Sequence, residues 1–198
     1  MKDGGAPPGA LVELRAVASA PVEAPISLSG AHYTDPALFE AERDGLLHRA
    51  WHCLGRDDEI PAPGDYFTLQ LLHEPLLAVR GDDGAVRVFA NLCRHRAMKL
   101  AEGAGAAKRF TCPYHAWSYA RDGALASAPR MPKDRVAGCR LHEFRTEIWR
   151  GFIYVNLSGD APALAPQLGA LGDLIGVYDQ SKMRIRHRED EIWRGNWK

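Results

Sequence analysis

The feature that most constrains this chain of 198 residues is a pair of short segments, each holding one cysteine and one histidine. The first reads Asn-Leu-Cys-Arg-His-Arg and contains Cys93 and His95. The second reads Thr-Cys-Pro-Tyr-His-Ala-Trp and contains Cys112 and His115. Two thiols and two imidazoles in such tight pairs indicate a metal site, which requires the fold to bring two separate loops together.

Two kinds of metal group accept this set of side chains. A [2Fe–2S] cluster of the mixed type binds two cysteines on one iron atom and two histidines on the other. A tetrahedral zinc ion also accepts two of each, but zinc sites usually group like with like, a Cys pair followed by a His pair. Here the types alternate, which favours the iron–sulfur cluster with Cys93, His95, Cys112 and His115 as ligands. A zinc-binding structural module, or ordinary core cysteines and surface histidines, are the alternatives.

At these residues the chain resembles a known family. The C-x-H and C-x-x-H pair looks like the Rieske motif, and the strings Cys-Arg-His-Arg and Cys-Pro-Tyr-His-Ala-Trp are similar to those of Rieske non-haem iron oxygenase alpha subunits, the aromatic ring-hydroxylating dioxygenase type. The resemblance extends from about residue 36 to residue 198. It implies a Rieske [2Fe–2S] domain at the front of an oxygenase subunit.

The resemblance also implies a function for the parent protein, that of an oxidoreductase acting as a mono- or dioxygenase. In the family, a reductase or ferredoxin supplies electrons to the cluster, and these pass to a mononuclear iron that uses O₂ to hydroxylate or demethylate an organic substrate. His115 is then the expected electron exit toward a neighbouring subunit, and the parent is expected to be a homo-oligomer built on trimers. A freestanding Rieske ferredoxin-like electron carrier is the alternative.

The last residues bear on catalysis. An Asn-Trp-Lys string, residues 196–198 here, opens the catalytic domain in the family. The mononuclear non-haem Fe(II) binds two histidines and a carboxylate, and no His-x₃₋₅-His pattern follows residue 187. We therefore expect the chain to be a front portion that carries no catalytic residue for oxygenation and cannot oxygenate a substrate alone.

Composition limits the remaining possibilities. The chain has 25 Lys and Arg and 25 Asp and Glu, so no excess charge favours nucleic acid or membrane as a partner. No apolar run is long enough to span a bilayer, and charged residues interrupt the N-terminal apolar stretch, so a cytoplasmic protein is expected. Cys53 and Cys139 lie outside the motif and are expected to be free and buried, and a disulfide between them is the alternative that their spacing leaves open.

The fold expected from the pattern is mainly β (α+β): an antiparallel Rieske-type β-sandwich with a leading helix and a trailing αβ segment. Residues 1–33 read as a flexible arm with a short ordered piece at 11–17, residues 34–158 as the Rieske domain with its leading helix, and residues 159–198 as a linker helix and the truncated start of a catalytic domain. Strands are predicted, from length and Val, Leu, Phe and Tyr content, at 66–72, 75–80, 85–90, 144–149 and 152–157.

Helices are predicted on either side of these strands. Thr34-Asp35-Pro36 is a helix start, and the apolar residues from Leu38 to Trp51 are expected to share one helical face. Residues 163–178 carry a leucine stripe at helical spacing. Residues 183–187 alternate as a short strand would.

Overall fold

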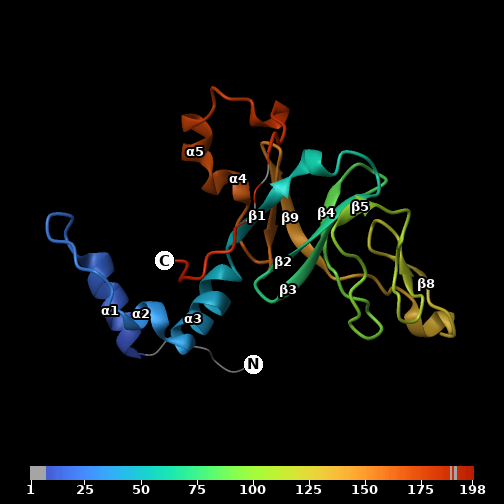
Figure 1. Ribbon diagram of the computed structural model, residues 1–198, viewed down its shortest axis with the longest axis horizontal. Helices are drawn as coiled ribbons and strands as arrows, with labels where there is room; N and C mark the ends of the chain where they lie inside the picture. The colour runs from blue at the N-terminus through green and yellow to red at the C-terminus, as the bar shows by residue number, and fades with distance from the viewer. Residues whose placement is uncertain (1–7, 188, 190) are drawn as a thin grey trace. The chain divides into compact units, whose positions relative to one another are not determined.

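The computed structural model describes residues 8–187, 189 and 191–198. Contacts within the chain define two units, residues 51–186 and residues 1–50 with 187–198, and each is described by itself (Figure 1). In the described residues no helix is both long and apolar enough to cross a membrane. The domain limits expected from the sequence stay predictions about the parent protein.

Antiparallel sheets form the body of the larger unit. A sheet of seven strands has the order β1-β10-β9-β4-β3-β2-β5, and a sheet of three has the order β6-β7-β8. This confirms the mainly β, two-sheet architecture. The strands are β1 (Trp51–Arg56), β2 (Asp65–Leu71), β3 (Glu74–Arg80), β4 (Val86–Ala90), β5 (Ala104–Ala106), β6 (Phe110–Thr111), β7 (Ser118–Tyr119), β8 (Leu125–Ser127), β9 (Glu143–Trp149) and β10 (Phe152–Asn156).

The five predicted strands lie within one residue of their observed bounds. Pairing follows chain order, β2 with β3, β3 with β4, and β9 with β10. The turn between β3 and β4 closes where Gly81 N–H donates to the Ala85 carbonyl, at 2.8 Å. These hairpins were predictable because alternating apolar strands and glycine turns are local signals.

The central hairpin is buried on both faces. Along β3, Leu77 and Val79 enter one hydrophobic cluster while Leu76 and Ala78 enter another. Successive side chains of a strand point to opposite faces, so β3 carries two cores. The cluster that holds Leu77 and Val79 also contains Cys93 and Cys112. The site predicted from the sequence is therefore built on the most deeply buried part of the sheet.

Short helical segments complete residues 51–186. They include α4 (Leu164–Gln167), α5 (Gly169–Leu174) and the 3₁₀ turns η2 (Asp57–Glu59), η3 (Lys133–Val136) and η4 (Gln180–Lys182). The single helix predicted over 163–178 is wrong, because the chain breaks between α4 and α5. Gly169 and Gly172 weaken helix formation there, and only Leu164 of the predicted stripe is buried in the described structure.

The strand predicted at residues 183–187 is also wrong. These residues are exposed and irregular, and the Met183 carbonyl accepts a hydrogen bond from the Arg56 guanidinium at 2.7 Å. An alternating pattern becomes a strand only when a neighbouring strand satisfies its backbone groups. The trailing segment therefore contains two short helices, α4 and α5, and no strand at residues 183–187.

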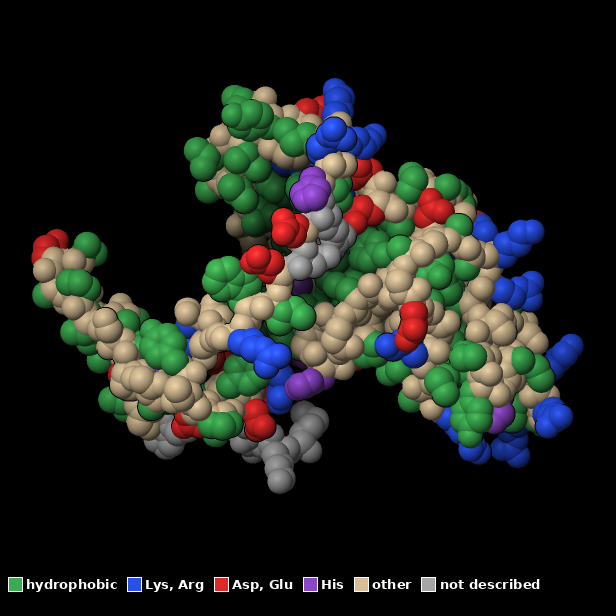
Figure 2. Space-filling model, in the orientation of Figure 1, with side chains coloured by type: hydrophobic (Ala, Val, Ile, Leu, Met, Phe, Trp, Pro, Cys, Tyr) green, Lys and Arg blue, Asp and Glu red, His purple; other side chains and the backbone are tan. Residues whose placement is uncertain are grey.

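The smaller unit is helical. It contains α1 (Pro8–Ser19), α2 (Ala31–Thr34), α3 (Pro36–Glu42) and the π-helical turn η1 (Arg43–Leu47). The predicted helix start is confirmed, since the Asp35 carboxylate accepts the Ala37 N–H at 2.8 Å. The ordered piece predicted at 11–17 lies within α1, which is longer than expected. Figure 2 shows hydrophobic side chains on the surface of these helices. Val12 and Phe39 are exposed.

Two further expectations are corrected. Trp51 does not share a helical face with Leu38; it is the first residue of β1 and pairs with Asn156. The π turn at η1 changes the angular spacing of the side chains, and Leu46 is exposed. Cys53 and Cys139 are free as expected, but neither is fully buried. Cys139 is half-buried, and Cys53 is exposed because it lies on the face of β1 opposite buried Leu54.

We predict that Gly123→Ala destabilises the larger unit more than Gly84→Ala. Both glycines have positive φ, +83° and +79°, so alanine costs about 1 kcal/mol of backbone strain at either place. At Gly123 the new Cβ would also lie 2.6 Å from Cε1 of buried Phe89, and such overpacking adds about 1–3 kcal/mol. Urea unfolding followed by fluorescence measures the difference; equal losses for the two variants would contradict it.

Candidate metal centre

Two hairpin loops of equal length carry the four predicted residues. The first runs from Leu92 to Lys99, which form an isolated antiparallel bridge. The second runs from Thr111 to Ser118, which pair between β6 and β7. In each loop the cysteine directly follows the first paired residue, so the two loops match position by position.

The backbone closes the first loop around its cysteine. Cys93 N–H donates to the Met98 carbonyl, and Ala97 N–H donates to the Cys93 carbonyl, both at 2.8 Å. Ala97 has φ of +52°, a left-handed conformation that non-glycine residues seldom adopt. The chain turns back sharply at this residue and holds the cysteine in place.

The second loop repeats this closure. Cys112 N–H donates to the Trp117 carbonyl at 2.7 Å, and Ala116 N–H donates to the Cys112 carbonyl at 3.0 Å. Ala116 is left-handed as well, with φ of +57°. The two loops therefore share one backbone design and present their thiols in the same way, whereas the histidine follows the cysteine by two residues in the first loop and by three in the second.

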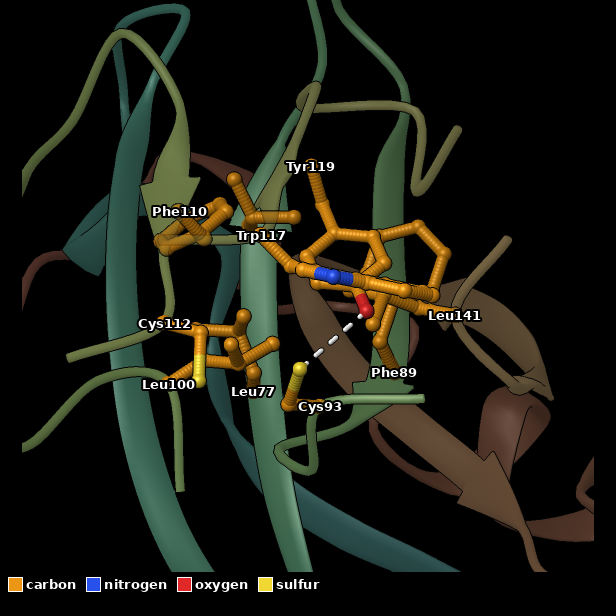
Figure 3. Close-up of a cluster of buried hydrophobic side chains, with 10 residues drawn as sticks. Leu77, Phe89, Cys93, Leu100, Phe110, Cys112, Trp117, Tyr119 and Leu141 are labelled. Carbon is orange, nitrogen blue, oxygen red and sulfur yellow. Dashed lines mark hydrogen bonds between the residues drawn. The ribbon is translucent and has the colours of Figure 1, made fainter. Parts of the chain in front are cut away.

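The structure brings the two predicted thiols into one buried cluster and the two predicted imidazoles against each other. Cys93 and Cys112 are only 3% and 2% exposed and belong to one buried cluster (Figure 3). The rings of His95 and His115 are 4.7 Å apart, edge to face. His95 is half-buried and His115 is exposed, so the thiols lie inward and the imidazoles lie toward the surface.

These side chains suit a two-metal cluster. Nδ1 of His95 is buried without a hydrogen-bond partner, an arrangement that proteins seldom tolerate unless the atom binds something else. Among the described residues, no three His, Cys, Asp or Glu side chains meet closely enough to hold one ion. A [2Fe–2S] cluster of the mixed type needs no such meeting point, because its cysteines and histidines bind different irons.

Trp117 supports the histidine side of the site. Its indole is 5% exposed and stacks on the His95 ring, with centroids 5.0 Å apart and planes 9° from parallel. Trp117 is a member of the core cluster, and its stacking also holds the plane of the His95 ring.

Tyr119 is a functional candidate that the sequence pattern did not single out. Its side chain is fully buried, and its hydroxyl lies 3.3 Å from Cys93 Sγ (Figure 3). The same hydroxyl accepts the Arg94 N–H at 2.9 Å, so its own hydrogen is free to donate to the sulfur. Burial and the neighbouring Cys93 raise the pKa of Tyr119, which keeps the phenol protonated and able to donate.

Asn91 braces the first loop from inside the core. Its amide nitrogen donates to the Ala101 carbonyl at 2.8 Å, and its oxygen accepts the N–H groups of Leu100 and Ala101 at 3.2 and 3.1 Å. It is 1% exposed. A polar residue just before the Cys-x-His pair was visible in the sequence, but its three partners lie nine and ten residues further on.

The outer side of the site is cationic and hollow. A cavity of about 460 Å³ is lined by His95, His115, Tyr114, Arg130 and Met131, among others. Partial desolvation is the largest cause that lowers the pKa of His115, and the nearby charges of His95, Arg96 and Arg130 lower it further. A lowered pKa favours the neutral imidazole, the form that binds a metal.

Comparison with known proteins agrees with this geometry. Residues 50–146 match the family described as the Rieske [2Fe-2S] domain. The glycine betaine monooxygenase oxygenase subunit of Chromohalobacter salexigens is 34% identical over 87% of this chain and 39% of its own length. The biphenyl 2,3-dioxygenase subunit alpha of Rhodococcus jostii is 38% identical over 69% of this chain and 31% of its own length.

A solved structure shows the same fold. The apo form of the quaternary ammonium Rieske monooxygenase CntA superposes with a TM-score of 0.70 and 30% identity, covering 76% of this chain and 45% of that one. The paired loops on an antiparallel sheet thus define an iron–sulfur domain of the Rieske type. More particularly, the chain belongs to the Rieske oxygenase family, as the Rieske [2Fe–2S] domain of an alpha, or oxygenase, subunit. It spans about two fifths or less of the length of these two curated relatives.

We predict that Asn91→Leu destabilises the larger unit by about 2–4 kcal/mol, because buried backbone groups of residues 100 and 101 lose their partners. Gln70→Leu is the control: its exposed amide makes one hydrogen bond, to the Leu72 carbonyl at 3.2 Å, and we expect a change within about 0.5 kcal/mol. Urea unfolding of both variants checks this. A cost for Asn91→Leu no greater than that of the control would show that Asn91 does not brace the loop.

Proposed function

We propose that this chain is the electron-transfer portion of an O₂-dependent oxygenase subunit. It would receive electrons from a reductase or ferredoxin and pass them toward a mononuclear non-haem Fe(II) in the catalytic domain of the parent protein, which hydroxylates or demethylates an organic substrate. The observation that carries the proposal is the matched pair of loops, each with a buried thiol and an outward imidazole. Homology to oxygenase subunits supports it.

We assign the cluster ligands to the two loops. Cys93 and Cys112 would hold one iron, and His95 and His115 would hold the other. When bound, the [2Fe–2S] group supplies a centre that takes up and releases one electron. The chain keeps water from the thiols by burying both in the hydrophobic cluster, and it orients one imidazole by stacking His95 on Trp117.

His115 is the proposed point of electron exit toward a neighbouring subunit of a trimer-based homo-oligomer. Its imidazole is exposed and borders the surface cavity, whereas both thiols are enclosed by the core. An electron leaving through this side chain would have the shortest route to another protein. Oxygen activation would belong to the mononuclear iron of the parent and not to the loops.

Spectroscopy tests the ligand assignment. Protein purified with iron should contain equal amounts of iron and acid-labile sulfide, and the reduced form should give the EPR signal of a His-ligated [2Fe–2S] cluster. Cys93→Ser, Cys112→Ser and His115→Ala should lose most of the cluster because each removes a ligand. Cys139→Ser and His187→Ala, which lie outside the two loops, should keep it. A zinc-loaded, EPR-silent wild type would refute the proposal.

Tyr119→Phe should lower the midpoint potential of the cluster by about 20–65 mV. A donor to the Cys93 sulfur stabilises the electron-rich reduced state, and one hydrogen bond contributes about 0.5–1.5 kcal/mol. Redox titration followed by EPR or circular dichroism measures the shift. Tyr154→Phe is the matched control, since the Tyr154 hydroxyl contacts the thiol of Cys53 on β1, away from the loops. Equal potentials for wild type and Tyr119→Phe would show that the hydroxyl does not tune the cluster.

A further inference from the structure

The two loops of the candidate centre belong to different sheets. The first loop follows β4 of the seven-stranded sheet, and the second loop joins β6 to β7 of the three-stranded sheet. A centre shared between the loops therefore requires a fixed orientation of one sheet against the other. The hydrophobic cluster that holds both thiols draws residues from both sheets, but apolar packing is non-directional and does not fix an orientation by itself.

Arg121 connects the two sheets directly. It lies in the turn between β7 and β8 of the three-stranded sheet. Its Nε donates to the Ala107 carbonyl at 2.9 Å, and its guanidinium also pairs with the Asp82 carboxylate. Asp82 belongs to the turn between β3 and β4 of the seven-stranded sheet, and Ala107 directly follows β5 of that sheet. The Arg121 side chain is only 18% exposed, so water competes weakly for these contacts.

The seven-stranded sheet leaves room for this guanidinium at Gly64. A Cβ at Gly64 would lie 2.8 Å from Nη2 of Arg121 and 2.6 Å from the Ala107 carbonyl oxygen. Gly64 N–H donates to the Arg80 carbonyl at 2.8 Å, and the Gly64 carbonyl accepts the Ala107 N–H at 2.9 Å. The carbonyl that receives Arg121 is thus itself held by the seven-stranded sheet.

Tyr119 makes a second connection between the sheets, at the first loop. Its hydroxyl lies 3.3 Å from Cys93 Sγ and accepts the Arg94 N–H at 2.9 Å (Figure 3). The partners of Tyr119 follow β4, whereas Asp82, the partner of Arg121, precedes it. The five residues of β4 separate the two connections by about 17 Å. One connection still allows the smaller sheet to pivot, and a second one at this distance prevents it.

We propose that Arg121 is a positioning residue that holds the sheet of the second loop in a fixed orientation against the sheet of the first loop. This deepens the proposed function and rests on it, because the orientation matters for an iron–sulfur cluster whose ligands come from both loops. Without the guanidinium, the smaller sheet would pivot about the Tyr119 contact, and the spacing between the two Cys and His pairs would vary. With it, the loops keep their spacing before the iron–sulfur cluster is inserted, and the bound cluster is lost more slowly.

Loss of the iron–sulfur cluster to an iron chelator, followed by visible absorbance, tests the proposal in Arg121→Gln. The rate of loss should rise about threefold to tenfold, because opening of the loops no longer breaks a hydrogen bond to a partly buried carbonyl. The EPR signal of the reduced variant should be broader than that of wild type, since the ligand spacing would differ among molecules. Arg121→Lys, which keeps the charge and a donor, should fall between the two.

Arg80→Gln is the matched control. The Arg80 guanidinium donates to three carbonyls outside the three-stranded sheet, at 2.7, 2.8 and 2.9 Å: those of Asp57, Ile60 and Gly84. Its loss should lower the urea midpoint of unfolding at least as much as Arg121→Gln does. It should nevertheless leave the rate of cluster loss within about twofold of wild type and the EPR line width unchanged. A merely structural role for Arg121 would make the two variants alike and would overturn the proposal.

Hydrogen exchange of the cluster-free protein separates this proposal from the proposed function. Amides of residues 110–127 should exchange at least about threefold faster in Arg121→Gln than in wild type, and no faster in Arg80→Gln. Equal rates of cluster loss in wild type and Arg121→Gln, whether or not exchange changes, would overturn the positioning role and leave the electron-transfer function intact. Absence of an iron–sulfur cluster from the wild type would instead overturn the proposed function, and the positioning role with it.

Discussion

The burial of two cysteine thiols in matching backbone loops is the constraint on which the rest of the larger unit depends. Each loop closes through hydrogen bonds from and to its cysteine, and each turns at a left-handed alanine. This closure directs Cys93 and Cys112 into the core while the histidines two and three residues later reach toward the surface. A centre between the loops would be shielded from water on one side and open to a partner on the other.

Satisfying the polar groups of these loops requires residues from elsewhere. The first loop would bury backbone N–H groups without partners if Asn91 and Tyr119 did not accept them. An unpaired buried donor costs about 1–3 kcal/mol, so these two side chains stabilise the loop as much as a well-packed core residue does. Tyr119 comes from β7, beyond the second loop, and therefore ties the two loops to each other.

Relatives with this domain include oxygenase subunits named for glycine betaine and for biphenyl, one a monooxygenase and the other a dioxygenase. They match this chain at 34% and 38% identity. The Rieske domain is therefore common to subunits named for chemically different compounds.

The sequence by itself determined five of the ten strands and the helix start, because alternating strands, glycine turns and the Asp35 cap are local signals. The donor set read from the ligand pairs stays a prediction. Tertiary structure alone decided which face of each strand is buried, and so placed Tyr119 against Cys93 and left Cys53 exposed. It also decided that residues 183–187 form no strand, since pairing depends on a neighbour distant in sequence. The concentration of positive charge around the histidines emerged in the same way, because the turn that carries Arg130 reaches the loops only in the folded chain.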